Sequence, residues 1–409
     1  MRTLIGKAIL GVAIASMTVA GLLAQAPAQP QWKDRAEYDL RVAIGEAITA
    51  NNGAKALELT KTWAEKYPTS DFKAEWPQLE LNAYRLMNDP KGMMSAAEKI
   101  LAGTPDDLTS NYWVCTLTLA NNLTSDAELA RADKSGQFLA NLQKPAAVKD
   151  PDWPALQKEM TSLGHKCVGW VAMNRKENEK AESAFIASLK VKGTDAQINS
   201  LLGNVILAQK VPEKQSEALF HYARASSYTG EGALPDQARG QLDTFLVNAY
   251  NRFHGEDPAG LQELRTLAKS QPLPPVGFKI LSSSEVAIAK DTRMKEEQPQ
   301  RYFWLRLKDA LVAESGVGYF ENGMKDALVP SKDQAPLKGT IVSGTKKSLT
   351  LALADDTTPE VTLVLDKALK EDPTPGTVVE FWGVAQKLNQ NPFMLEFLIA
   401  GEQAELKMN

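Results

Sequence analysis

The stretch Gly169–Leu189, with the sequence GWVAMNRKENEKAESAFIASL, is followed by a related stretch, Gly203–Ser226, with the sequence GNVILAQKVPEKQSEALFHYARAS. In each stretch a glycine precedes an alanine, an aromatic residue four positions later, and a small residue three positions after that. The two glycines are 203 − 169 = 34 residues apart, and the second stretch has three extra residues around Pro212. Positions i, i+4 and i+7 lie on one face of a helix, so each stretch predicts a helical hairpin whose glycine lets two helices approach closely.

A longer array of such hairpins is one interpretation, and two hairpins in an ordinary all-α bundle are the alternative. Pro68 and Pro105 are 105 − 68 = 37 residues apart, and each follows a predicted second helix. Counting back from Pro68 places Ala56 at the alanine position of the pattern. The pair Pro274-Pro275 ends the helical region, because proline interrupts helices. This spacing favours an array that extends toward the N-terminus.

The segment from Gly169-Trp170-Val171-Ala172-Met173 to Phe185 resembles a tetratricopeptide-repeat protein. The whole chain resembles the secreted repeat proteins of soil acidobacteria that carry a small β-rich C-terminal domain. In the second copy no residue matches the tryptophan position of this family, and the N-terminal copies lack the glycine. The resemblance implies protein–protein interaction in the cell envelope and supplies neither catalytic residues nor a cofactor.

The first 28 residues have the features of an export signal. Arg2 and Lys7 provide positive charge, residues 8–24 are apolar or small, and Ala26-Pro27-Ala28 offers a cleavage site. The alternative is an uncleaved anchor helix, but about 17 apolar residues is the short limit for a bilayer span. We therefore expect a periplasmic or secreted protein without a stable membrane span, and a mature net charge of −4 − 2 = −6.

The remaining chain divides into three predicted regions: helical repeats over 29–271, an irregular capping and linker region over 272–335, and a small β domain over 336–409. In the middle region we expect a helix over Gln300–Val312 that caps the helical stack through Trp304, Leu307 and Leu311. Five short segments rich in β-branched or aromatic residues predict the strands of the last region, at 339–342, 349–353, 361–365, 378–384 and 393–399. The predicted fold class is thus mainly α, with a tetratricopeptide-like α-solenoid followed by a five-stranded, oligonucleotide/oligosaccharide-binding-like (OB-like) barrel and a helical turn at 367–369.

Composition excludes several classes of protein. Of 409 residues, 44% are hydrophobic and 23% charged, which is typical of a globular chain. With a net charge of −4 and only the short basic pair Lys346-Lys347 in the tail, no nucleic-acid partner is predicted. The two cysteines, Cys115 and Cys167, do not have metal-ligand spacing. Either they are buried separately as small apolar residues, or they form a bridge.

The search for catalytic groups gives only weak candidates. His254-Gly255-Glu256-Asp257 mixes histidine with carboxylates, but a helix end and the next N-cap explain it without a metal. Asp355-Asp356 with Glu360, and Glu371-Asp372, could be paired acids for glycoside cleavage, although turns explain them better. His165 and His221 are expected to pack inside repeat helices. No phosphate loop or nucleophile motif is present, so we predict no catalytic, cofactor-binding or metal residues and no enzyme activity.

Two functions remain open from the sequence. The first is an exported, non-catalytic scaffold that binds a protein or peptide partner in the groove of the repeat array. The second is a carbohydrate-binding or carbohydrate-processing envelope protein, suggested by eight tryptophans and the barrel class. Burial of Trp304 or Trp382 would remove the main support for this second function. The oligomeric state is left open.

Overall fold

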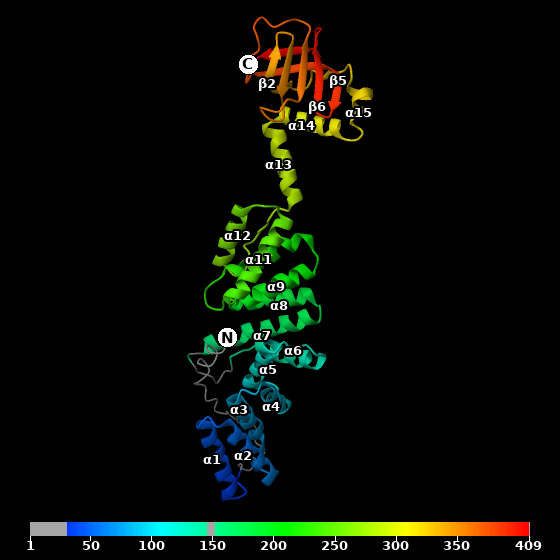
Figure 1. Cartoon of the computed structure of the whole chain (residues 1–409). Coiled ribbons are helices and arrows are strands. Elements are labelled where there is room, and N and C mark those ends of the chain that lie inside the picture. Colours follow the sequence, from blue (N-terminus) through cyan, green and yellow to red (C-terminus); the bar gives the residue numbers. More distant parts are fainter. Residues whose placement is uncertain (1–30, 145–150, 152, 409) are drawn as a thin grey trace. The chain divides into compact units, whose positions relative to one another are not determined.

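The computed structural model describes residues 31–144, 151 and 153–408. The described residues form two compact units (Figure 1): one contains those up to Asp236 and Ala268–Pro274, and the other contains Gln237–Leu267 and those from Pro275 onward. The predicted export signal at 1–28 lies outside the described residues. None of the described helices is both long and apolar enough to cross a bilayer.

The first unit is built from successive pairs of helices, and each helix contacts the next one along the chain. Short 3₁₀ turns, Lys73–Glu75 and Pro212–Lys214, precede α3 and α10. The pairs are α1 (Arg35–Thr49) with α2 (Gly53–Lys66), α3 (Trp76–Met87) with α4 (Pro90–Gly103), α5 (Leu108–Ala120) with α6 (Asp126–Ala140), α7 (Trp153–Asn174) with α8 (Asn178–Val191), and α9 (Ala196–Ala208) with α10 (Gln215–Ser227). The predicted array is therefore confirmed as a run of helical hairpins.

The glycines of the two quoted stretches have the predicted role. A Cβ at Gly169 would lie 2.5 Å from the Phe185 ring, and one at Gly203 would lie 2.9 Å from the Tyr222 ring. Both distances are shorter than real carbon contacts, so only glycine allows these helices to pack so closely. Each glycine is on a first helix and each aromatic ring on the second helix of the same pair. The sequence pattern therefore described a real packing contact.

A third close approach has no counterpart in the sequence analysis. Between α6 and α7, a Cβ at Gly164 would lie 2.2 Å from the backbone nitrogen of Ala140 and 2.7 Å from the carbonyl oxygen of Gly136. Here two glycines meet, whereas the α7–α8 and α9–α10 contacts each use a glycine and an aromatic ring. The α6–α7 crossing is consequently a backbone-to-backbone contact between consecutive pairs.

Two helices follow the array, α11 (Asp236–Phe253) and α12 (Pro258–Ser270). The next helix, α13 (Ser283–Glu297), falls in the region that the sequence analysis described as irregular. Ser282 and Glu285 form a capping box at its start, a signal that was available in the sequence. None of its residues is buried, so it lacks the apolar periodicity by which helices are usually recognised.

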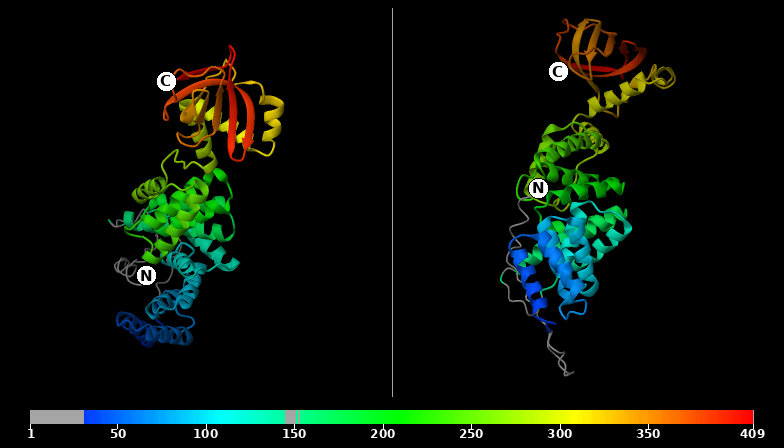
Figure 2. Two further views of the ribbon diagram at one scale, coloured as in Figure 1. Left: turned by 45° about the horizontal axis from the view of Figure 1, so that its top comes forward. Right: turned by 60° about the horizontal axis from the view of Figure 1, so that its bottom comes forward.

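The second unit contains a seven-stranded sheet whose central strands form a closed ring of pairings. β2 pairs with β3, β3 with β4, β4 with β6, β6 with β5, and β5 again with β2. The β4–β6 pairing is parallel and the others are antiparallel, and Figure 2 shows the sheet curling round on itself. The strands are β1 (Leu328–Val329), β2 (Leu337–Thr345), β3 (Ser348–Ala352), β4 (Val361–Leu365), β5 (Val378–Gln390), β6 (Phe393–Ile399) and β7 (Glu405–Met408).

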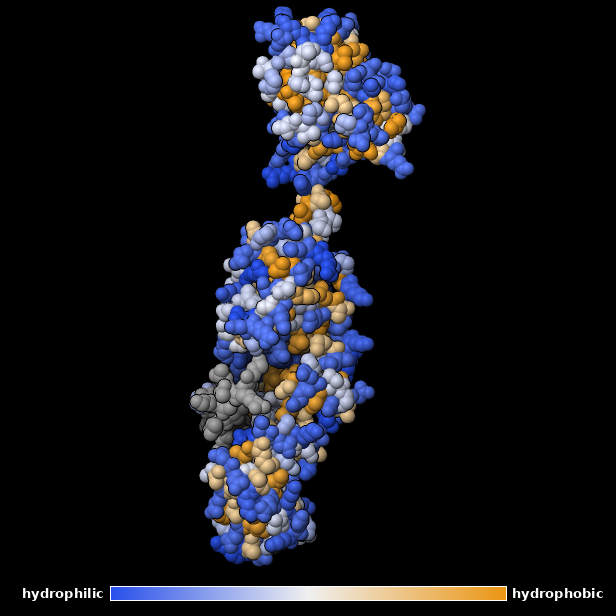
Figure 3. All heavy atoms as spheres, in the orientation of Figure 1, coloured by the Kyte–Doolittle hydropathy of each residue, from blue (hydrophilic) through white to orange (hydrophobic). Residues whose placement is uncertain are grey.

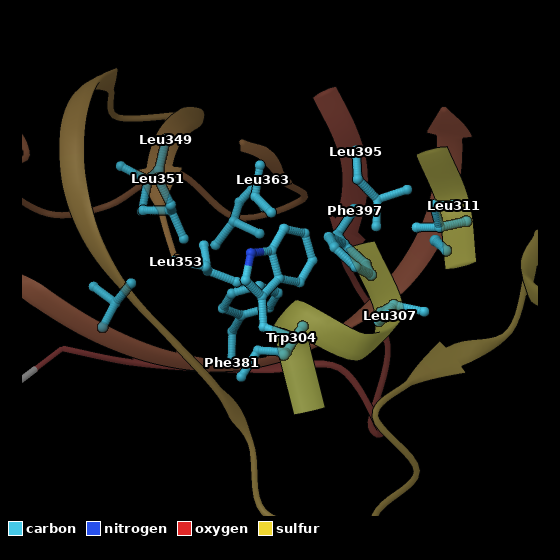
Figure 4. Packing of buried hydrophobic residues seen from close by; sticks show 14 of the residues in the cluster. Trp304, Leu307, Leu311, Leu349, Leu351, Leu353, Leu363, Phe381, Leu395 and Phe397 are labelled. Atoms are coloured by element: carbon cyan, nitrogen blue, oxygen red, sulfur yellow. The ribbon is translucent and has the colours of Figure 1, made fainter. Parts of the chain in front are cut away.

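Helix α14 (Pro299–Val312) belongs to the core of this sheet. Trp304, Leu307 and Leu311 are buried together with strand residues, and Figure 4 shows the Trp304 indole beside Leu353 and Leu363. The expectation that these three residues cap the helical stack was wrong, because they are buried in one cluster with residues of the strands. The same core joins two predicted regions, 272–335 and 336–409. A short helix, α15 (Gly316–Tyr319), and a π-helical turn, Phe320–Met324, lead from α14 to β1.

The helical turn expected at Lys367–Leu369 is absent, and these residues lie in an irregular loop between β4 and β5. In this loop, the backbone nitrogen of Leu369 donates to the carbonyl of Lys346, at the β2–β3 turn. The segment is therefore held by a neighbouring hairpin instead of by its own helical hydrogen bonds. Within the described residues of this unit, α14 is the helix that fills the core beside the strands.

Candidate interaction surface

The first helices of successive pairs lie next to one another along the first unit. Helices α1 and α3 are in contact, and so are α5 and α7. A side chain of one first helix also reaches the N-cap aspartate of the next: Gln78 Nε2 lies 3.5 Å from Asp107 Oδ2, and Lys166 Nζ lies 2.7 Å from Asp195 Oδ2. In both cases donor and acceptor are 29 residues apart (107 − 78 and 195 − 166). The same polar link therefore occurs twice, at equivalent positions of the repeat.

Each of these aspartates also fixes the start of its own helix. Asp107 Oδ1 accepts a hydrogen bond from the backbone nitrogen of Ser110 at 2.7 Å, and Asp195 Oδ1 accepts one from Gln197 at 3.0 Å. An N-cap side chain satisfies backbone donors that the helix itself leaves free. One carboxylate thus begins a first helix and also holds the preceding one, which keeps the row of first helices in register.

Partly exposed apolar side chains lie on α5 and α7. Tyr112, Leu163 and Trp170 pack against one buried cluster and keep part of their surface accessible. The Trp170 indole nitrogen donates to the carbonyl oxygen of Leu123 at 3.4 Å, which fixes the ring against the α5–α6 turn. Figure 3 shows apolar surface where Figure 1 draws α5, α6 and α7. We call the accessible surface of α5 and α7 around these three residues the first-helix surface.

The charged and titratable groups of α7 do not form a catalytic arrangement. His165 is half-buried, and burial lowers the pKa of its imidazole, so the ring is neutral at pH 7. Its neighbour Lys166 is paired with Asp195. The expected packing role of His165 agrees with this environment. The surface can offer apolar contact and a few fixed polar groups, which suits recognition of a protein segment.

His221, on α10, has the packing role expected from the sequence, with 2% of its surface exposed. Its Nδ1 lies 2.8 Å from Asn199 Oδ1, and burial lowers the pKa of the imidazole to about 3. Asn199 is also buried, and its side-chain nitrogen has no hydrogen-bond partner among the described residues. Asn199 could not be predicted as a buried polar residue, because an asparagine in an amphipathic helix has no distinctive spacing. This pair is part of the core and is closed to a ligand.

Arg224 is a second buried polar residue that sequence reasoning missed. Its guanidinium donates to the carbonyl oxygens of Ala268, Lys269 and Gly193, and it lies 3.7 Å from the centre of the Tyr228 ring. Burial lowers the pKa of Arg224, while Tyr228 acts in the opposite direction. A fork of several donors can satisfy carbonyl groups at the end of a helix and in a loop together. Arg224 therefore holds residues 268 and 269 within the first unit.

The sequence candidate for a metal site is a local structural arrangement. His254 Nδ1 donates to the carbonyl oxygen of Leu281 at 2.7 Å, and His254 Nε2 lies 3.4 Å from Asp257 Oδ2. Asp257 accepts from the backbone nitrogen of Gly260 at 3.0 Å and so begins α12. In the described part of the chain, no three histidine, cysteine, aspartate or glutamate residues gather as metal ligands do.

The acidic candidates of the β region do not form a catalytic pair. Glu360 is buried, with 2% of its surface exposed, and accepts hydrogen bonds from the Trp304 indole at 2.8 Å and from Lys308. Asp355 instead caps an exposed turn, where backbone and side-chain hydrogen bonds from Thr358 and Thr357 lower the pKa of its carboxyl. Glu360 is therefore a buried structural carboxylate, and Asp355 is a carboxylate that stabilises a turn. Glu371-Asp372 lie exposed in the β4–β5 loop.

The two tryptophans that were to decide the carbohydrate hypothesis are buried. Trp304 has no exposed surface and Trp382 has 9%. Trp382 donates to the carbonyl oxygen of Gln334 at 3.2 Å, and the ammonium groups of Lys332 and Lys407 lie 4.2 and 5.1 Å from its ring centre. These contacts use the ring for packing, so the main support for sugar binding is lost.

Comparison with known proteins yields only distant structural similarity. No protein-family model matches the sequence, and no curated protein matches it. A tetratricopeptide-repeat protein of Thermus thermophilus, TTC0263, shares 15% identity over 52% of this chain and 98% of its own, with a TM-score of 0.26. The pilF protein of Pseudomonas aeruginosa shares 13% identity over 65% of this chain and 95% of its own, with a TM-score of 0.32. Such scores carry no argument about this chain, and its tetratricopeptide-like character rests on the helix contacts described above.

Proposed function

We propose that this protein is an exported, non-catalytic scaffold that binds a segment of a protein partner in the cell envelope through its first-helix surface. The observation that carries this proposal is the row of first helices kept in register by Asp107 and Asp195, with Tyr112, Leu163 and Trp170 partly exposed upon it. Apolar side chains held on a rigid scaffold bind a partner at a low entropic cost. The export signal predicted at 1–28 supports the location, and the remaining titratable candidates have structural roles.

We further propose that the C-terminal ring of strands is an OB-like barrel that provides a second contact surface. Its support is the connectivity: a β2–β3–β4 meander, a parallel β4–β6 pairing, and β5 closing the ring onto β2. This is the strand order of a five-stranded Greek-key barrel. In this interpretation α14 takes the place of the helix that was expected between β4 and β5.

Site-specific photo-crosslinking in the organism that makes the protein tests the scaffold proposal. A photoreactive amino acid at Thr116 or Met173, on the first helices α5 and α7, should give a protein adduct of defined mass. The same group at the exposed positions Lys134 and Ser183, on the second helices α6 and α8, should not. Equal adducts at all four positions, or none at Thr116 and Met173, would contradict binding through the first-helix surface.

The location is tested separately by cell fractionation. The full chain should accumulate outside the cytoplasm as a species that lacks residues 1–28, identified by N-terminal sequencing. A variant with Arg2 and Lys7 replaced by glutamate should stay in the cytoplasm at full length, because a positive n-region is needed for export. Recovery of an intact N-terminus from the membrane fraction would instead support the uncleaved anchor.

A further inference from the structure

The two cysteines of the chain come together in the core of the first unit. Cys115 lies on α5 and Cys167 on α7, which are consecutive first helices in contact with each other. Both are fully buried members of one apolar cluster, and both are free thiols. The Cys167 sulfur lies 3.3 Å from the carbonyl oxygen of Ala132, on α6. The pKa of Cys115 is raised well above its ordinary value, first by burial and then by the adjacent Cys167 thiol.

The repeat explains why a small residue is needed at Cys115. Cys115 comes eight residues after its N-cap Asp107 (115 − 107), and Gly203 comes eight residues after its N-cap Asp195 (203 − 195). Cys115 therefore occupies the position at which the α9–α10 pair has its close-packing glycine. Packing alone requires only a small side chain at this position, and alanine or glycine would meet that requirement. It does not explain a second thiol beside it on the next first helix.

We propose that Cys115 and Cys167 are a dithiol–disulfide site, and that its oxidation covalently joins the first helices α5 and α7. The proposal rests on the proposed export only for the oxidising compartment in which the bond would persist. The oxidant is a disulfide, either a small molecule or the active site of a thiol oxidase.

The chemistry is two successive exchanges. The thiolate of one cysteine attacks a sulfur of the oxidant disulfide, forms a mixed disulfide and releases one thiol. The thiolate of the second cysteine then attacks the protein sulfur of that mixed disulfide and releases the second thiol. The protein loses two protons and two electrons, and the oxidant disulfide is reduced to two thiols.

Burial decides when this reaction can occur. In the folded unit neither thiol has exposed surface, so an oxidant cannot form the mixed disulfide there. The bond therefore forms while α5, α6 and α7 are still open, as the chain folds after export. Once folded, the same burial protects the bond from reductants. The closed loop spans α6, so the bond connects two consecutive pairs of the array.

The length of the loop that the disulfide closes sets the expected gain in stability. Closing a loop of about 50 residues restricts the unfolded chain enough to shift the folding equilibrium of these pairs on the order of a thousandfold. The gain should be concentrated in α5, α6 and α7, because repeat arrays are stabilised mainly by neighbouring units.

The test uses the full-length chain, unfolded in denaturant and refolded with oxidised glutathione or, in a parallel sample, with a reductant. The oxidised sample should lose two hydrogens in its intact mass, and proteolysis should release one peptide pair that joins Cys115 to Cys167. Slower amide exchange in α5–α7 should accompany the bond. Chain already folded under reducing conditions should react with oxidised glutathione far more slowly than refolding chain.

Two variants keep the test decisive. Cys115→Ala and Cys167→Ala should each refold with unchanged helical content, because alanine is smaller than cysteine and favours a helix, but should give no intramolecular bond and no slowing of exchange. A wild-type chain that refolds fully with oxidised glutathione and still retains two alkylatable thiols would overturn the proposal. This outcome is independent of export, because a chain retained in the cytoplasm can still form the bond in the refolding assay.

Discussion

Replacement of Glu360 should separate α14 from the strands of the second unit. Glu360 lies just before β4 and is 2% exposed. One carboxylate oxygen accepts from the Trp304 indole at 2.8 Å and from the backbone nitrogens of Leu353 at 3.2 Å and Ala354 at 2.7 Å, and the other accepts from Lys308. Trp304 and Lys308 are both on α14, so a single buried carboxylate connects this helix to the segment between β3 and β4.

The magnitude follows from the number of donors left without an acceptor. In Glu360→Gln, one amide oxygen can still serve the three N–H donors, but Lys308 loses its charged partner, which costs about 1.5–3 kcal/mol. In Glu360→Ala, the Trp304 indole and two backbone nitrogens lose their acceptor inside the core, which costs about 3–5 kcal/mol. Lys308→Met is the matched control: it removes the same ion pair but leaves the other three hydrogen bonds in place.

Hydrogen exchange of the full chain, followed peptide by peptide in increasing denaturant, is the suitable assay. Amides of α14 should exchange faster in the order wild type, Glu360→Gln, Glu360→Ala, while those of α1 to α10 should not change. Glu360→Gln and Lys308→Met both remove the same ion pair. The loss of stability in the double variant that carries both should therefore be smaller than the sum of the losses in the two single variants. Unchanged exchange of α14 in Glu360→Ala would refute the view that this carboxylate anchors the helix.

Three further predictions concern the first unit. Gly169→Ala should destabilise this unit by about 1–3 kcal/mol in denaturant unfolding, because the new Cβ would lie 2.5 Å from the Phe185 ring. The same change at Gly45 on α1, where a Cβ would meet only the Arg41 guanidinium at 3.6 Å, should be neutral or stabilising, and equal effects at both positions would contradict close packing at Gly169. The pKa of His221 is about 3 in the folded protein, below the ordinary 6.5, so the stability that its neutral ring contributes is complete above about pH 6.5 and is lost as pH falls toward 3. Between these pH values the free energy of unfolding should drop by up to about 1.4 kcal/mol per pH unit, and His221→Gln should flatten that slope. Arg224→Lys keeps the positive charge but loses the forked set of guanidinium donors, so the opening free energy of amides just after residue 268 should fall by about 1–3 kcal/mol and these amides should exchange faster. Wild-type exchange rates in the lysine variant would show that the forked donors have no role in holding this segment.

Elements of regular local pattern could be predicted from the sequence, and elements held by distant contacts could not. The stripe of Ala181, Phe185 and Ser188 is visible in sequence because a helix repeats its own face every three to four residues. The assignment of α14 failed for the opposite reason: Trp304 marks an apolar face, but nothing local says which of two apolar surfaces covers it. The carboxylate that accepts the hydrogen bond of the Trp304 indole, Glu360, lies 56 residues away along the chain.

The candidate site shows the same division. Spacing predicted the pairs that contain α7 to α10, and the common catalytic motifs were not found in the sequence, so a scaffold was the hypothesis before any contact was known. The first-helix surface itself depends on which partly buried side chains remain accessible, and Tyr112 and Trp170 look like ordinary core residues in the sequence. Arg224 and Asn199 were missed because a polar residue on an amphipathic helix is usually solvated, and only packing buries them.

By itself, the sequence determined the helical hairpins, the small close-packing residues at Gly169 and Gly203, and the run of strands from Leu337 onward, because each of these is set by neighbours along the chain. Only the tertiary structure decided that α14 completes the core of the strands, that Cys115 and Cys167 lie in one buried cluster, and that Arg224 binds carbonyls 44 and 45 residues away. The physical reason is that a hydrophobic face or a hydrogen-bond donor specifies the kind of surface it requires, whereas its partner is chosen when distant segments compete to bury it.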